Sequence, residues 1–140
     1  MLQIKLLDPE DTTHTRHTTH TIYKLHEKLT NEKLGSHPTY IFYDNNKFVG
    51  YIVLIYMKNH TIKIDWIYGP KYGKQIMKKM ERLFKKENIK KIVLNVSIDP
   101  NEQKKTVMRR INFYISLNYR VYDIIFRPKY GPLLKMEKYL

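Results

Sequence analysis

Residues 61–98 of the chain read TIKIDWIYGPKYGKQIMKKMERLFKKENIKKIVLNVSI, and they contain three patterns in succession. Along Thr61–Tyr68 apolar and polar residues alternate, as in a half-buried strand. Gly69-Pro70 breaks that pattern, and along Lys71–Glu87 the apolar residues recur every three or four positions, as on one face of a helix. Residues Ile92–Ile98 alternate again. A strand, a helix and a strand in this order form a crossover, so the sequence predicts that the two strands are parallel.

The residues before this stretch predict antiparallel strands. Tyr40–Tyr43 and Phe48–Tyr56 are rich in β-branched and aromatic residues. Asp44–Lys47 lies between them and is a hairpin signal. A second turn, Lys58–His60, leads into Thr61–Tyr68. The sequence therefore predicts a meander of three antiparallel strands that feeds the parallel crossover.

The two ends of the chain add five further elements. They are, in chain order, a strand at Met1–Leu7, a helix that starts at Asp8–Thr13 and runs to about Leu29, a helix that starts at Asp99–Asn101 and stops near Asn118, a strand at Tyr119–Phe126 and a closing strand at Leu133–Leu140. With no repeat and no linker, the 140 residues are expected to form a single domain, 1–140. The predicted fold class is α/β, with a mixed, mostly antiparallel sheet and one parallel strand–helix–strand crossover.

Positive charge is the strongest feature of the composition. The chain has 26 Lys and Arg against 13 Asp and Glu, which gives a formal net charge of +13. Such a field attracts polyanions, for example nucleic acid, a nucleotide cofactor or an acidic protein. Lysine supplies 20 of the 26 cations and alanine is absent. Because AT-rich genomes impose this bias, part of the charge is attributed to codon usage, as in some large DNA viruses.

Several classes of protein are excluded by what the sequence lacks. There is no cysteine, which removes disulfides, thiolate zinc sites and cysteine nucleophiles. No apolar run reaches the roughly 18 residues of a membrane span, and no secretory signal opens the sequence. A cytoplasmic protein is therefore expected. His14, His17 and His20 are spaced by three, whereas zinc sites more often pair i with i+4, so no metal is predicted.

Three segments carry a resemblance to a known family. Tyr68–Ile76, YGPKYGKQI, looks like the acetyl-CoA motif of the GNAT superfamily of acyl-CoA-dependent N-acetyltransferases. Phe113–Tyr119, FYISLNY, is similar to the Tyr-x-x-x-Gly-Phe signature of that superfamily, and Leu134–Leu140, LKMEKYL, is similar to its closing strand. The resemblance implies an N-acetyltransferase that moves an acetyl group from acetyl-CoA to an amine acceptor by direct transfer.

The first of these segments also predicts a cofactor site from its own chemistry. The start of a helix carries unpaired amides and a partial positive charge, so it binds phosphate. Lys71 and Lys74 add positive charge for a pyrophosphate. The cofactor-binding residues that the resemblance implies are Ile67, Tyr68, Lys71, Tyr72, Gly73, Lys74, Gln75, Ile76 and Met77. Gln75 and Met77 stand where the family has small residues, and their side chains would narrow the approach to the backbone. The alternative is a helix-start turn with no ligand.

Two residues are candidates for proton transfer. Tyr114 matches the tyrosine that protonates the departing CoA thiolate in many family members, and a tyrosine, with a pKa near 10, is protonated at neutral pH. The alternative is a core tyrosine. Asp65 is the only carboxylate of Thr61–Tyr68, the strand that carries the general base in many members. The alternative for Asp65 is a surface acid paired with Lys63.

The sequence is also compatible with a second class of function, a binding module without enzymatic activity. The altered glycine loop and the high positive charge also suit a catalytically degenerate GNAT-fold module that binds nucleic acid or an acidic protein. Basic clusters such as Lys85–Lys91 come without the aromatic or groove-reading motif of a nucleic-acid binder, and they are expected to be solvated helix faces. The sequence does not identify the acceptor amine or the oligomeric state.

Overall fold

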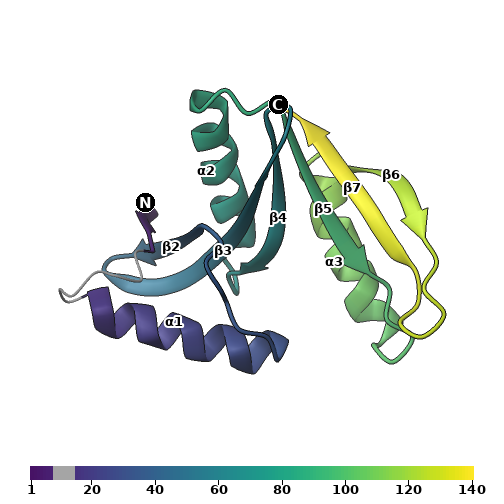
Figure 1. The fold of residues 1–140 in the computed structure, drawn as a ribbon, viewed down its shortest axis with the longest axis horizontal. Coiled ribbons are helices and arrows are strands. Elements are labelled where there is room, and N and C mark those ends of the chain that lie inside the picture. Colours follow the sequence, from purple (N-terminus) through teal and green to yellow (C-terminus); the bar gives the residue numbers. More distant parts are fainter. Residues whose placement is uncertain (8–14) are drawn as a thin grey trace.

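In the computed structural model, residues 1–7 and 15–140 are described, with side chains from residue 21 onward in the second range. Figure 1 shows one twisted sheet with helices against it. In chain order the elements are β1 (Gln3–Leu6), α1 (Thr15–Thr30), β2 (Thr39–Asp44), β3 (Lys47–Met57), β4 (Thr61–Tyr68), α2 (Gly73–Lys86), β5 (Lys91–Ser97), α3 (Lys104–Ser116), β6 (Arg120–Ile125) and β7 (Leu133–Tyr139). The helix-start signal at residues 8–13 lies outside the described residues.

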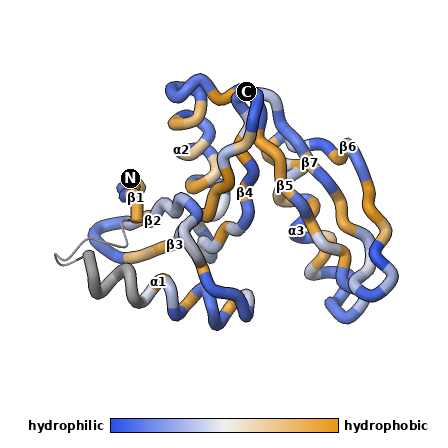
Figure 2. The backbone as a smooth tube through the Cα atoms, in the orientation of Figure 1, coloured by the Kyte–Doolittle hydropathy of each residue, from blue (hydrophilic) through white to orange (hydrophobic). Residues whose placement is uncertain are grey.

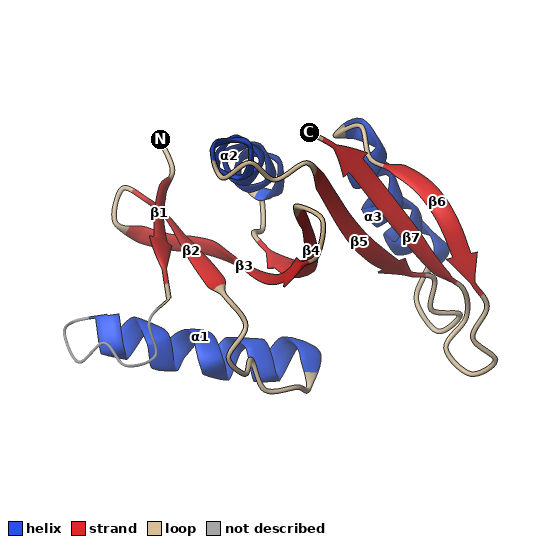
Figure 3. Cartoon of the chain, turned by 45° about the horizontal axis from the view of Figure 1, so that its top comes forward, coloured by secondary structure: helices blue, strands red, loops and turns tan. Residues whose placement is uncertain are grey.

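The sheet has the predicted mixed topology. Its strand order is β1-β2-β3-β4-β5-β7-β6, and β4 and β5 are its one parallel pair. Every other pair is antiparallel. The parallel pairing joins only Thr61–Ile64 to Lys91–Leu94. Beyond these residues the two strands diverge, so the sheet opens into two halves that Figure 3 shows from a tilted view.

Asparagine turns set the meander. Asn45 and Asn46 have φ of 50° and 65°, as in the two-residue turns that join β-hairpins. Asn59 and His60 repeat this geometry between β3 and β4, with φ of 62° and 54°. Asparagine tolerates the left-handed region better than most residues. The two predicted turns are confirmed, and together they bring three strands into antiparallel register.

Helix α2 buries the apolar face that its periodicity predicts. Ile76, Met77, Met80 and Phe84 are fully buried in the larger core cluster, on one face of the sheet. Gly50 on β3 permits this close approach, because a Cβ there would lie 2.3 Å from the Tyr68 carbonyl oxygen and 2.7 Å from the Ile76 side chain. A second cluster, which includes residues of α1, β2 and β3, covers the opposite face. Strand β3 thus packs against apolar side chains on both faces of the sheet.

Two details of the α3 region differ from the sequence prediction. Asp99 does not cap a helix: its Oδ1 accepts a hydrogen bond from the Asn101 amide at 2.8 Å, which closes a local turn, and α3 begins only at Lys104. Ile115, for which its spacing of four from Ile111 predicts an inward position, is 51% exposed. Asn118 ends the helix as predicted, with φ of 70°. Within residues 1–7 and 15–140, no helix is long and apolar enough to cross a membrane.

Candidate active site

The divergence of β4 and β5 creates a cleft of about 1000 Å³. Its walls come from four elements: the end of β4, the start of α2, the end of β5 and one face of α3. Because β5 pairs with β4 only as far as Ile64, the backbone edge of Asp65–Tyr68 that faces β5 has no strand partner. The cleft therefore offers free backbone groups on one wall and side chains of α3 on the other.

The start of α2 offers a cluster of free amides beside this cleft. The first bond of the helical ladder runs from the Ile76 amide to the Tyr72 carbonyl at 2.9 Å. The amides of Gly73, Lys74 and Gln75 precede that bond, so they have no helical carbonyl as partner. A Cβ on Gly73 would lie only 3.0–3.1 Å from the Phe113 ring of α3. Glycine at position 73 thus keeps the space between the amides and the Phe113 ring open.

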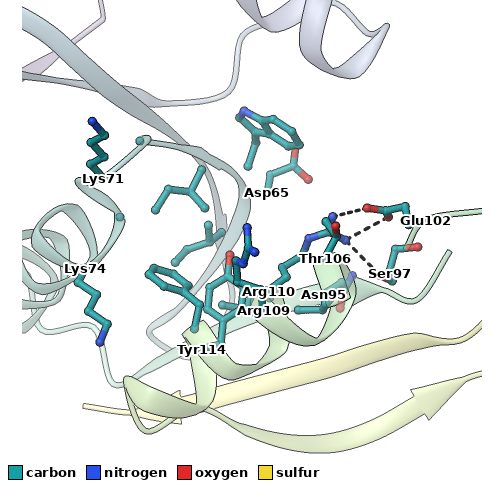
Figure 4. Close-up of a pocket in the computed structure, with 18 of the residues that line it drawn as sticks. Asp65, Lys71, Lys74, Asn95, Ser97, Glu102, Thr106, Arg109, Arg110 and Tyr114 are labelled. Carbon is teal, nitrogen blue, oxygen red and sulfur yellow. Dashed lines mark hydrogen bonds and ion pairs between the residues drawn. The ribbon is translucent and has the colours of Figure 1, made fainter. Parts of the chain in front are cut away.

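Five of the nine predicted cofactor residues line the cleft: Ile67, Lys71, Gly73, Lys74 and Gln75. Figure 4 shows Lys71 and Lys74 on the α2 side. Both lysines are exposed. Their ammonium groups add positive charge around the amide cluster, which suits an anionic group.

The structure places the other four predicted cofactor residues elsewhere. The side chains of Ile76 and Met77 are fully buried in the core, because they lie on the apolar face of α2. Met77 therefore does not narrow the approach to the loop backbone. The hydroxyl of Tyr72 donates a hydrogen bond to Asp44 Oδ2 at 2.9 Å. The ring of Tyr68 lies 5.9 Å from the ring of Tyr51, in the cluster on the opposite face of the sheet.

Tyr114 lies in the α3 wall of the cleft, as Figure 4 shows. Its side chain is buried, and burial raises the pKa of its hydroxyl to about 12, with the nearby Arg110 opposing the rise. The ring packs edge-on against Phe113, with 5.1 Å between centroids. At neutral pH the hydroxyl is therefore protonated and held in place, which is the state of a proton donor.

Asp65 occupies an irregularity in β4. On the facing strand β3, Val53 pairs with Trp66 and the next residue, Leu54, pairs with Ile64, so Asp65 has no partner there. This bulge places Asp65 on the cleft, where it is exposed. In the part of the chain that the structure describes, Asp65 forms no ion pair with Lys63 or another cation. Among those residues the carboxylate of Asp65 is therefore not paired with a cation.

Two arginines of α3 line the cleft, and the sequence did not predict them as site residues. Arg110 Nη2 lies 2.7 Å from Glu102 Oε2, and Arg110 Nη1 donates to the Ser97 carbonyl at 3.2 Å. Figure 4 shows these bonds at the end of the cleft away from Lys74. Arg109 also lines the cleft and is exposed, and among the described residues it forms no ion pair. The available signal was the position of Arg110, four residues or about one helical turn before Tyr114.

A buried histidine lies on the α1 side of the sheet, close to the bulge. His26 Nδ1 is 2.8 Å from the Tyr51 hydroxyl, and its ring packs edge-on against Tyr51 and Trp66. Burial lowers the pKa of His26, and the carboxylates of Asp65 and Glu32 oppose this change. The side chains of His17 and His20 and the whole of His14 lie outside what the structure describes.

We expect His26 to make the stability of the fold depend on pH. The unfolded chain binds the proton with a pKa near 6.5, whereas the folded chain binds it only at lower pH. The unfolded state therefore carries more protons between the two pKa values, so the free energy of unfolding falls as the pH drops below about 6.5. Urea unfolding at pH 7.5 and pH 5.0 measures this loss. It should be smaller in His26→Gln, and an equal loss in both proteins would contradict the assignment.

Comparison with known proteins decides the family. A family model described as "Acetyltransferase (GNAT) family" matches residues 3–114, which span β1 to Tyr114. The chain belongs to the GNAT acetyltransferase family. The resemblance of the sequence to the GNAT superfamily is therefore confirmed, together with the fold class.

Individual GNAT relatives are distant. The chain is 30% identical, over 96 residues, to an uncharacterised N-acetyltransferase of Acanthamoeba polyphaga mimivirus. The match covers 66% of this chain and 23% of that protein, so the chain spans about a quarter of the length of this curated relative. The relative is a viral protein.

Solved GNAT structures share the fold at low sequence identity. An aminoglycoside 6'-N-acetyltransferase of Enterococcus faecium superposes with a TM-score of 0.73 at 12% identity, over 98% of this chain and 96% of that chain. A GNAT family acetyltransferase of Elizabethkingia anophelis, with acetyl-CoA bound, gives a TM-score of 0.69 at 16% identity, over 99% and 98%. At these identities the likeness establishes the architecture of this chain.

Proposed function

We propose that this GNAT domain is an N-acetyltransferase that moves an acetyl group from acetyl-CoA to an amine acceptor by direct transfer. One observation carries the proposal. The cleft between β4 and β5 combines the free amides of Gly73–Gln75, the unpaired edge of β4 and the protonated Tyr114 in a single space. Each of these groups matches one part of acetyl-CoA: the pyrophosphate, the pantetheine arm and the thioester.

The residues present fit acetyl-CoA. The amides of Gly73, Lys74 and Gln75 would hold the pyrophosphate, and the ammonium groups of Lys71 and Lys74 would balance its charge. The β4 backbone at Ile67 and Tyr68 would pair with the amide groups of the pantetheine arm, as a further strand would. Ile76 and Met77 support the helix from the core and do not touch the donor. Bound acetyl-CoA supplies an acetyl group on a thioester carbon that an amine can attack.

The side chains of the cleft then provide the proton transfers. Asp65 takes a proton from the acceptor amine, directly or through water, as the bond between nitrogen and the acetyl carbon forms. A β4 amide near Ile67 and Tyr68 polarises the thioester carbonyl. The Tyr114 hydroxyl donates its proton to the sulfur as the carbon–sulfur bond breaks. The proton held by Asp65 then returns to Tyr114 through solvent, so the balance is one N-acetylated product and one free CoA thiol, with no covalent enzyme intermediate.

The degenerate binding module is not the function that we propose. Its main argument from the sequence was the altered glycine loop. Of the two larger side chains in that loop, Met77 is buried in the core and Gln75 is exposed at the rim. The amide cluster therefore remains open, and the positive charge, the other argument for the module, suits the anionic acetyl-CoA as well.

Amine-dependent release of free CoA thiol tests the proposal. Purified protein is mixed with acetyl-CoA and with a panel of acceptors: polyamines, aminoglycosides, lysine peptides and peptides with free N-termini. We expect release with at least one acceptor class, together with a mass gain of 42 Da on that acceptor, about the mass of an acetyl group in place of a proton. The transferase proposal would be contradicted if the protein binds acetyl-CoA but releases thiol, with every acceptor class, at the same rate as without an acceptor.

A further inference from the structure

The loop between β4 and α2 has a strained backbone. Lys71 has a φ of 70°, in the left-handed region that lysine seldom adopts. Such strain persists only where the surrounding structure holds the residue in place. Two residues further on, Gly73 begins α2 and the run of free amides. A change in the shape of this loop would therefore move the amides that we assign to the pyrophosphate.

The backbone of Tyr72 connects this loop to the helix. The Tyr72 amide donates a hydrogen bond to the Gly69 carbonyl at 2.9 Å, which closes the loop. The Tyr72 carbonyl accepts the first bond of the helical ladder, from the Ile76 amide, at 2.9 Å. The free amides of Gly73–Gln75 lie between these two bonds in the chain. The position of Tyr72 thus sets the position of the amides.

The side chain of Tyr72 ties the loop to the hairpin of β2 and β3. Its ring packs against the larger core cluster, and its hydroxyl donates a hydrogen bond to Asp44 Oδ2 at 2.9 Å. Asp44 ends β2, and the turn that follows it is hydrophilic, as Figure 2 shows. The bond to Asp44 raises the pKa of the Tyr72 hydroxyl, so the hydroxyl remains a donor at neutral pH. Asp44 Oδ1 also lies 3.8 Å from the exposed Met1 amine, a contact that adds little.

We infer that Tyr72 is a positioning residue for the acetyl donor, because its hydrogen bond to Asp44 holds the loop in the shape that presents the α2 amides to the pyrophosphate. This inference rests on the proposed function. Without the bond, Lys71 relaxes toward ordinary backbone angles, and only a fraction of the molecules keep the competent loop. The apparent dissociation constant then rises in inverse proportion to that fraction. Neither Tyr72 nor Asp44 lines the cleft, so the chemistry at Tyr114 should be unaffected.

Isothermal titration with acetyl-CoA tests the inference. Tyr72→Phe keeps the ring and removes the donor, whereas Asp44→Ala removes the acceptor, and each should raise the dissociation constant at least about fivefold. Loss of the Asp44 charge would by itself favour the anionic acetyl-CoA, so weaker binding cannot come from net charge. The double variant should bind within about twofold of the weaker single variant, because both changes break one bond. Asp44→Asn keeps an acceptor oxygen and should restore part of the affinity.

Two further comparisons separate positioning from a general loss of packing. Tyr139→Phe removes the hydroxyl of a β7 tyrosine that is 62% exposed, and it should leave the dissociation constant within about twofold. S-acetyl-pantetheine carries the thioester but no pyrophosphate. With the best acceptor, Tyr72→Phe should lower kcat/KM for acetyl-CoA at least about fivefold through KM, with kcat kept, and leave kcat/KM for S-acetyl-pantetheine within about twofold.

Three outcomes would overturn the inference. They are an unchanged affinity in Tyr72→Phe and Asp44→Ala, losses that multiply in the double variant, and an equal loss with both donors. Both residues are partly exposed, so the variants should fold, and urea unfolding checks this. If one variant unfolds, the other still tests the bond. An unmodified protein that binds no acetyl-CoA would contradict the proposed function and the inference together, whereas the three outcomes contradict the inference alone.

Discussion

Replacement of Gly73 by glutamate should weaken acetyl-CoA binding by about 100-fold or more, which corresponds to a loss of about 3 kcal/mol. Position 73 is the first residue of α2, where the free amides begin. A carboxylate there would place negative charge at the site proposed for the pyrophosphate, where the helix dipole favours anions. The new Cβ would also lie 3.0–3.1 Å from the Phe113 ring and narrow the cleft. Isothermal titration with acetyl-CoA measures the loss.

A matched control separates this local effect from a change in net charge. Met57→Glu adds the same single negative charge at an exposed position of β3 that pairs with Thr61, at the opposite end of β4 from Tyr68 and the start of α2. It should leave the dissociation constant within about twofold, since exposed charges beyond about 10 Å are largely screened. Equal weakening by both substitutions would mean that acetyl-CoA is held by the overall field of the protein and not by the α2 amides.

The second large effect is expected at Tyr114. Tyr114→Phe should lower kcat by about 100-fold or more, the usual scale for removal of a general acid. Acetyl-CoA affinity should change by less than about threefold, because the ring that packs against Phe113 is kept. Steady-state kinetics with the best acceptor, together with titration of acetyl-CoA, measure the two quantities separately. A large change in affinity with an unchanged kcat would assign Tyr114 to binding instead.

Tyr119→Phe is the control, because it removes a buried hydroxyl to which we assign no proton transfer. The Tyr119 ring lies 5.9 Å from that of Tyr114, and burial raises the pKa of its hydroxyl well above the usual value. Among the residues that the structure describes, that hydroxyl has no hydrogen-bond partner. Tyr119 lies outside the cleft. Tyr119→Phe should therefore retain nearly full activity. If both substitutions lower kcat alike, the effect comes from packing at the end of α3 and not from proton donation.

Local chemistry explains why most of the fold could be predicted. Asn45-Asn46 and Asn59-His60 adopt left-handed turns that few other residue pairs favour, and they set the meander without help from distant contacts. The apolar face of α2 is equally local, because its period is that of the helix. The error at Asp99 has a local cause too. Aspartate hydrogen-bonds an amide two residues on in a turn as readily as at a helix start.

The candidate site was less predictable because it depends on how elements meet. Ile76 and Met77 belong to the loop motif in sequence, but the rotation of α2 about its axis points both into the core. The bulge at Asp65 is visible only in the register between β3 and β4. Arg109 and Arg110 reach the cleft because α3 lies against the diverging end of β5. Each of these placements depends on tertiary structure, which neither the periodicity of the sequence nor a motif predicts.

The central claim is that the cleft between β4 and β5 is an acetyl-CoA site. Isothermal titration of the unmodified protein with acetyl-CoA, at about 0.15 M salt, tests it most directly. We predict saturable binding of about one molecule per chain, with a dissociation constant in the micromolar range. No saturable heat, together with no thermal stabilisation of the protein at millimolar acetyl-CoA, would contradict the claim, because a molecule that binds the folded state must stabilise it.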